Sequence, residues 1–142
     1  MLKPKVYKLA FLTLLLVCIV QAAYIFFSGP FLPEPSRIIS VTPVDTAGAV
    51  YEVLYDSGGA TVPFVYRYFL IEKTDNAVAA LDKIKSSSPF LVTQSSGAVR
   101  ATLPGRVKLR TLDVVYEYRN IAYYEANGEW KRVKLDLTSD IP

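Results

Sequence analysis

Histidine is absent from this chain of 142 residues, and cysteine occurs once, at Cys18. Without histidine, neither a Ser-His nor a Cys-His nucleophilic system can be built. A single cysteine excludes an internal disulfide, and no cluster of Cys and His is available as a metal site. We therefore expect no catalytic residues, no cofactor and no metal, and a fold that is held together by its hydrophobic core.

Charge is absent from the run Leu9–Phe27 (LAFLTLLLVCIVQAAYIFF). As a helix rising about 1.5 Å per residue, this run reaches roughly 28 Å, close to the thickness of the hydrocarbon core of a bilayer. We therefore predict a transmembrane anchor over residues 9–27. Its main apolar side chains are those of Leu9, Leu14, Leu15, Leu16, Ile19, Phe26 and Phe27.

Positive charge lies on one side of this run, at Lys3, Lys5 and Lys8. Such an asymmetry keeps the basic side in the cytoplasm. Residues 1–8 are thus expected to be a cytoplasmic tail. In a bacterium the chain would be a single-pass protein of the inner membrane with its C-terminal domain in the periplasm.

Two other interpretations of the N-terminus remain open. Val20-Gln21-Ala22 is a candidate cleavage site for a signal peptide, but apolar sequence continues beyond it to Phe27. Cys18 is a candidate lipidation site, but Val17 stands before it, where bacterial lipidation sites have a small residue. A retained anchor is the preferred interpretation because of the length of the run.

The segment 28–36 (SGPFLPEPS) is predicted to be a linker, because its three prolines favour an extended spacer over a helix. Beyond it, residues 37–142 form the outer domain. Three of the 16 basic residues and one of the 13 acidic residues precede this domain, which therefore carries 13 basic against 12 acidic residues. A domain so close to neutral gives no support to nucleic-acid binding.

Within the outer domain, apolar residues recur mainly with period two, which is typical of strands. Strands are predicted over residues 37–42, 49–55, 60–72, 90–94, 98–103, 106–111, 114–118, 121–125 and 129–137. One helix is predicted from a cap at Thr74 or Asp75 to Lys85. Asn127-Gly128 between two strands indicates a tight hairpin. We expect an α+β fold: a transmembrane helix followed by one small, mainly antiparallel β-sheet domain with a single packed helix.

The strand segment Phe64–Phe69 (FVYRYF) combines tyrosines with an arginine. Both residue types are common binding hot spots, so Tyr66, Arg67 and Tyr68 are candidate partner-binding residues. The alternative is that the tyrosines cover the core while Arg67 points to solvent.

A second candidate surface is basic. Arg106, Lys108 and Arg110 share one face of a strand, and Lys131, Arg132 and Lys134 would join them if the last strand lies nearby. Such a face can dock an acidic partner or anionic lipid headgroups. The alternative is an ordinary solvated strand face with Val107 and Leu109 packed beneath it.

Two further features give little support to catalysis or to phosphate binding. Glu117 lies among tyrosines, but a general acid or base of a glycosidase needs a facing carboxylate, and no spacing pairs Glu117 with Glu52, Asp113 or Glu125. Gly58-Gly59 is followed by neither a P-loop lysine nor a helix, so it is expected to be a turn.

The stretch GGATVPFVYRYFL at Gly58–Leu70, together with the order of anchor, spacer and β-rich domain, resembles an uncharacterised group of short single-span envelope proteins of Gram-negative bacteria. The layout also resembles that of periplasmic immunity proteins. This resemblance implies a non-catalytic module that binds a protein partner, either a toxin or an envelope component. An accessory subunit of an envelope complex is the second interpretation, and an enzyme acting on envelope carbohydrate or peptide is the third.

Overall fold

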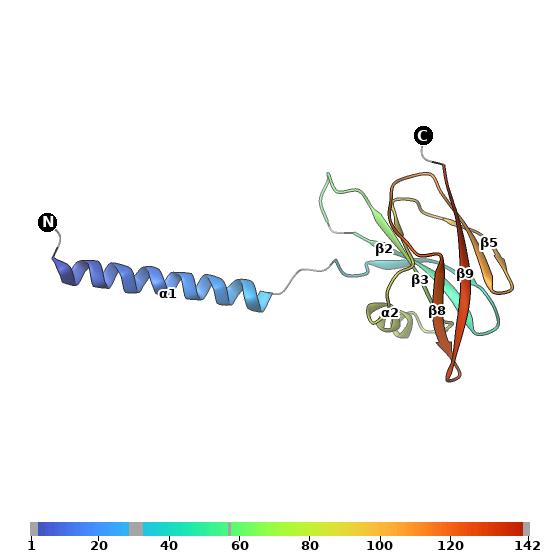
Figure 1. Ribbon diagram of the computed structural model, residues 1–142, viewed down its shortest axis with the longest axis horizontal. Helices are drawn as coiled ribbons and strands as arrows, with labels where there is room; N and C mark the ends of the chain where they lie inside the picture. The colour runs from blue at the N-terminus through green and yellow to red at the C-terminus, as the bar shows by residue number, and fades with distance from the viewer. Residues whose placement is uncertain (1–2, 29–32, 57, 141–142) are drawn as a thin grey trace. The chain divides into compact units, whose positions relative to one another are not determined.

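The computed structural model describes residues 3–28, 33–56 and 58–140, and the chain divides into two compact units, residues 1–32 and 33–142 (Figure 1). In the first unit the helix α1 (Pro4–Ser28) contains the whole of the predicted anchor. By length and composition α1 can cross a membrane, and its described side chains are not buried within the protein. Residues 29–32 of the predicted linker lie outside the described residues.

The second unit confirms the predicted α+β class. Its elements are β1 (Arg37–Pro43), β2 (Gly48–Tyr55), β3 (Val65–Glu72), α2 (Ala77–Lys85), β4 (Leu91–Thr93), β5 (Val99–Leu103), β6 (Arg106–Thr111), β7 (Val115–Tyr118), β8 (Ile121–Ala126) and β9 (Glu129–Ser139). The strands form two sheets, a five-stranded one in the order β1-β2-β3-β4-β7 and a four-stranded one in the order β5-β6-β9-β8. All pairings are antiparallel except that of β6 with β9, which is parallel.

The core has two parts because the central strands β2 and β3 bury both of their faces. Tyr68 and Leu70 of β3 lie in the cluster between the two sheets, together with Val107 and Leu109 of β6. Phe69 of β3 lies in a second cluster beneath α2. Successive residues of β3 thus alternate between the two clusters, and α2 covers one face of the five-stranded sheet (Figure 1).

The starts of β3 and of α2 differ from the predictions. β3 begins at Val65 and not at residue 60, because Pro63 lacks the N–H that a ladder requires. Pro63 consequently lies in the connection between β2 and β3. The N-cap of α2 is Asn76, whose Oδ1 accepts a hydrogen bond from the Val78 N–H at 2.9 Å, and not Thr74 or Asp75.

The predicted turn at Gly58-Gly59 lies in the same connection. Both glycines have a positive φ, of 66° and 144°, which side-chain-bearing residues rarely adopt. Ser57, which precedes these glycines, lies outside the described residues.

Candidate functional site

The outer face of the four-stranded sheet gathers basic residues from two strands. In the parallel β6–β9 pair, Arg106 lies beside Lys134, and the exposed side chains of Lys108 and Arg110 follow along β6. Arg132 lies on the same face of β9. The last strand lies next to β6, so Arg132 and Lys134 extend the predicted basic surface.

Lys131 does not belong to this surface. It alternates to the opposite face of β9, where its Nζ lies 3.7 Å from the Asp45 carboxylate and 6.0 Å from the centre of the Tyr124 ring. The candidate basic residues on β9 are thus two and not three.

Two large aromatic side chains share this outer face. Trp130, the only tryptophan of the chain, is 71% exposed, and Tyr123 is 58% exposed. In the β8–β9 ladder Tyr123 lies opposite Arg132, and Trp130 lies opposite Glu125. We call the surface of Tyr123, Trp130, Arg132, Lys134, Arg106, Lys108 and Arg110 the aromatic-basic face. Sequence reasoning missed its aromatic part, although Trp130, Arg132 and Lys134 follow one another at period two.

Ion pairs neutralise part of this face. Arg106 lies 3.3 Å from Asp136, and Arg110 lies 2.7 Å from Asp140. These exposed pairs contribute little to stability, but they hold the two guanidinium groups in place. Lys108 and Arg132 form no ion pair with the residues that the structure describes, so their charges are available to a partner.

Tyr68 was predicted as a candidate partner-binding residue. This prediction is wrong, because the side chain is fully buried. Its hydroxyl donates to the Ser95 carbonyl at 2.8 Å and accepts from the Ala98 N–H at 3.1 Å. Burial raises the pKa of Tyr68 above its ordinary value. Tyr68 is therefore a core residue that holds the loop 94–98, and it is not accessible to a partner.

The neighbours of Tyr68 are half-buried. The Arg67 guanidinium lies 4.3 Å from the centre of the Tyr55 ring, in a cation–π arrangement on the face of the sheet that carries the α2 cluster. Tyr66 packs at the edge of the cluster between the sheets. This segment is therefore used mainly in packing, and the aromatic-basic face is the better candidate for binding.

Glu117 and Glu52 are not assembled into a catalytic pair. Glu117 on β7 is exposed and lies 3.0 Å from Arg119. Glu52 on β2 is buried, accepting hydrogen bonds from Ser40, Ser96 and Gly97, and two strands separate it from β7 in the sheet. Within the described ranges, no three Asp, Glu or Cys side chains are grouped so that they could hold a metal ion.

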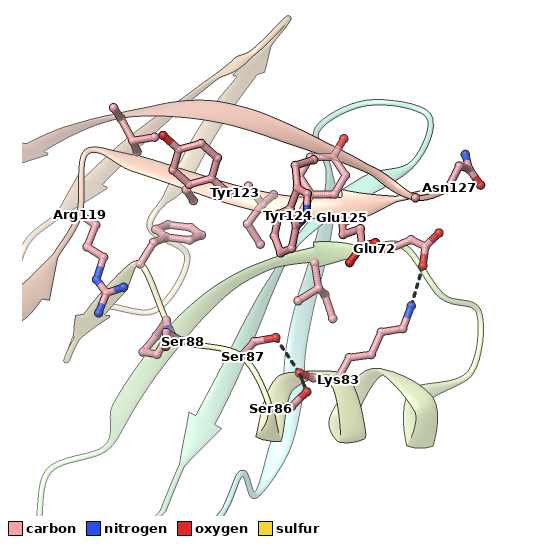
Figure 2. Close-up of a pocket in the computed structure, with 18 residues that line it drawn as sticks. Glu72, Lys83, Ser86, Ser87, Ser88, Arg119, Tyr123, Tyr124, Glu125 and Asn127 are labelled. Carbon is pink, nitrogen blue, oxygen red and sulfur yellow. Dashed lines mark hydrogen bonds and ion pairs between the residues drawn. The ribbon is translucent and has the colours of Figure 1, made fainter.

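A groove of about 690 Å³ borders the aromatic-basic face. One side is formed by β8 and Trp130, and the opposite side by β3, the end of α2 and residues 86–90. Figure 2 shows Tyr123 and Tyr124 on one side of the groove and Ser86, Ser87 and Ser88 on the other. This is a volume typical of sites that bind small ligands or peptides.

Comparison of the chain with protein-family models, with curated proteins and with solved structures gives no match. No functional residue can therefore be transferred to it from a relative.

Proposed function

We propose that the protein is a membrane-anchored, non-catalytic module that binds a protein partner in the periplasm through the aromatic-basic face. The observation that carries this proposal is the exposure of Trp130 beside Tyr123 on a regular sheet face. Tryptophan, tyrosine and arginine are the residues most enriched at binding hot spots, and all three types lie together on this exposed face.

The cationic residues support a partner of acidic character. Lys108 and Arg132 carry unneutralised charge next to the aromatic pair. A protein surface with exposed carboxylates would gain steering and specificity from them. The nearly neutral outer domain as a whole argues against non-specific binding to polyanions, since the positive charge is local.

The anchor gives this binding a physical advantage. We propose that α1 spans the inner membrane with residues 1–8 in the cytoplasm, because basic residues precede it. A tethered module meets other membrane-confined proteins at a raised effective concentration. An inhibitor or immunity protein that intercepts its target at the membrane would benefit most, and this is the role we favour.

Photo-crosslinking in intact membranes tests the proposal. The full chain is made with a benzophenone amino acid at position 130, at position 132, or at position 78 as a matched control. Val78 is also exposed, but it lies on α2 and belongs neither to the aromatic-basic face nor to the residues that line the groove. We expect a discrete adduct from 130 and 132 and none from 78. Absence of any adduct from both face positions would overturn the proposal.

Exchange of residues 1–36 for an unrelated exported anchor separates two roles. An inhibitor retains its adduct after this exchange, because only tethering is needed. An accessory subunit that assembles through its membrane helix loses it.

A further inference from the structure

The two sheets of the domain have four edge strands, and β8 has the fewest of the features that protect an edge from pairing. β1 contains a register shift and ends at Pro43, and β5 contains a shift between Val99 and Ala101. β7 has only four residues. β8 has six residues, contains neither proline nor a basic residue, pairs with β9 without any shift, and carries one charged side chain, that of Glu125. Natural edge strands are commonly protected by several such features together, so β8 is the edge most open to pairing.

The hairpin geometry determines which backbone groups of β8 are free. Asn127 and Gly128 form the two-residue turn, both with positive φ (55° and 76°), and Ala126 pairs with Glu129. In such a hairpin the closing pair is hydrogen-bonded, and the next pair is not. The N–H and C=O of Glu125 therefore point away from β9.

The same alternation continues along the strand. The Leu135 N–H donates to the Asn120 carbonyl at 2.8 Å, as this alternation requires. The backbone groups of Ile121, Tyr123 and Glu125 thus point outward, and none of them has a hydrogen bond to another residue in the described part of the chain. They form an open row of donors and acceptors at the spacing of an extended strand.

This open edge faces the groove. Across the groove, residues 86–89 are fixed at the end of α2, since the Ser86 and Ser87 hydroxyls donate to the Lys83 carbonyl at 2.9 and 2.7 Å. Figure 2 shows Arg119 near one end and the Glu72–Lys83 ion pair, at 2.7 Å, near the other. Leu70 and Phe90 supply apolar lining between them.

We infer that the open edge of β8 binds one extended segment of the partner protein, which adds a fifth strand to the four-stranded sheet. The inference rests on the proposed binding function and names the kind of segment that the partner contributes. Backbone pairing with Tyr123 and Glu125 supplies general affinity, and the segment's alternate side chains meet either the groove lining or Tyr123 and Trp130.

A single chain fits this edge better than a second copy of the protein does. The wall at residues 86–89 stands opposite β8, and every copy carries the same wall beside its own free edge. Edge-to-edge pairing of two folded copies would bring these walls together, whereas one extended peptide needs only the width of a strand, about 4.8 Å from β8.

The test uses the full chain in detergent micelles and a defined strand probe. The probe is a capped peptide of about eight residues in which valine alternates with threonine between terminal lysines. The control peptide has the same sequence with every second backbone nitrogen methylated, which removes donors without changing side chains. Trp130 lines the groove and is the only tryptophan, so its fluorescence reports binding.

We expect saturable binding of the probe below about 1 mM and at least about tenfold weaker binding of the methylated peptide. Tyr123→Pro removes an outward N–H and should weaken binding about tenfold, whereas Tyr123→Val keeps that N–H and should change it less than about threefold. Circular dichroism verifies that both variants are folded.

Equal binding of the two peptides, no saturable response, or equal effects of the two variants would overturn the inference. The inference would also be wrong if the protein were a dimer in detergent and Tyr123→Pro made it monomeric. The edge of β8 would then pair with a second copy of the protein. The crosslinks from positions 130 and 132 are independent of this result. If the crosslinks form but the two strand peptides do not bind as expected, the proposed binding function stands and only the strand-pairing inference is lost.

Discussion

The Tyr124 hydroxyl donates a hydrogen bond to the carboxylate of Asp45, 79 positions away in the sequence. Tyr124 belongs to β8 of the four-stranded sheet, and Asp45 belongs to the connection between β1 and β2 of the five-stranded sheet. The bond therefore joins the two sheets at the side of the domain where the open edge of β8 lies. It also fixes the strand that we propose as the binding edge.

Removal of the Tyr124 hydroxyl is the first prediction. Tyr124→Phe keeps the ring in the core but leaves Asp45 without this donor, and we expect a loss of about 1–2 kcal/mol in the free energy of unfolding. Tyr123→Phe is the matched control, because Tyr123 is exposed and has no such bond; its effect should stay within about 0.5 kcal/mol. Chemical denaturation followed by circular dichroism measures both. Equal stability of the two variants would contradict the prediction.

Gly48 provides the second prediction. A Cβ at this position would clash with Cζ of the Tyr124 ring, so Gly48→Ala should destabilise the fold by about 1–3 kcal/mol. Because the cost arises from one ring, it should shrink strongly when Gly48→Ala is made in a Tyr124→Ala background. A double-mutant cycle measures this coupling. Additive effects would show that the clash is relieved elsewhere.

The third prediction concerns acid stability. Partial burial of Asp45 works to raise its pKa, but hydrogen bonds from Tyr124, Gly48 and Ala47 and the charge of Lys131 outweigh it and lower the pKa below its ordinary value. A depressed folded-state pKa stabilises the fold at pH values above the ordinary pKa, and this contribution is lost as the pH falls through the folded-state value. Asp45→Asn should therefore flatten the loss of stability in strong acid. Denaturant unfolding at neutral and acidic pH measures the free energy of unfolding of both proteins. If it fell by the same amount in both as the pH is lowered, the prediction would be wrong.

The sequence pattern predicted local structure well where a feature depends on neighbours in the chain. The alternation of Val107 and Leu109 with basic residues gave the two faces of β6, and Asn127-Gly128 gave the hairpin. The parallel pairing of β6 with β9 could not be predicted, because period two says which residues share a face and not which strand lies alongside.

Because a local pattern does not reveal which strands are neighbours, it also could not predict which strand faces are accessible to a partner. Tyr68 and Trp130 both lie on strands, yet Tyr68 is covered by the second sheet while Trp130 faces solvent. Which face is covered depends on the sheet order, and so does the open edge of β8. Neither is a property of a local run of residues.

Glu52 carries the fourth prediction. This buried carboxylate accepts hydrogen bonds from the Ser40 and Ser96 hydroxyls at 2.8 and 2.7 Å and from the Gly97 N–H at 3.0 Å. Glu52→Gln replaces one acceptor oxygen with an NH₂ group and removes the negative charge that strengthens these hydrogen bonds, and we expect a loss of about 1–3 kcal/mol in the free energy of unfolding. Glu125→Gln, at an exposed position, serves as the control. If Glu52→Gln were as stable as the control, the three bonds would not contribute to folding.

The last prediction concerns α1 as a membrane span. Leu15 lies near the middle of the apolar run 9–27, where a charged side chain raises the free energy of insertion by about 2.5–3.5 kcal/mol. Leu15→Arg should therefore reduce the fraction of protein that resists alkaline carbonate extraction. Tyr7→Arg, which adds the same charge beside the terminal lysines, is the matched control and should leave this fraction unchanged. If the two variants extract alike, the run does not cross the bilayer as a retained helix, and the tether on which the proposed capture of a membrane-confined partner depends would be absent.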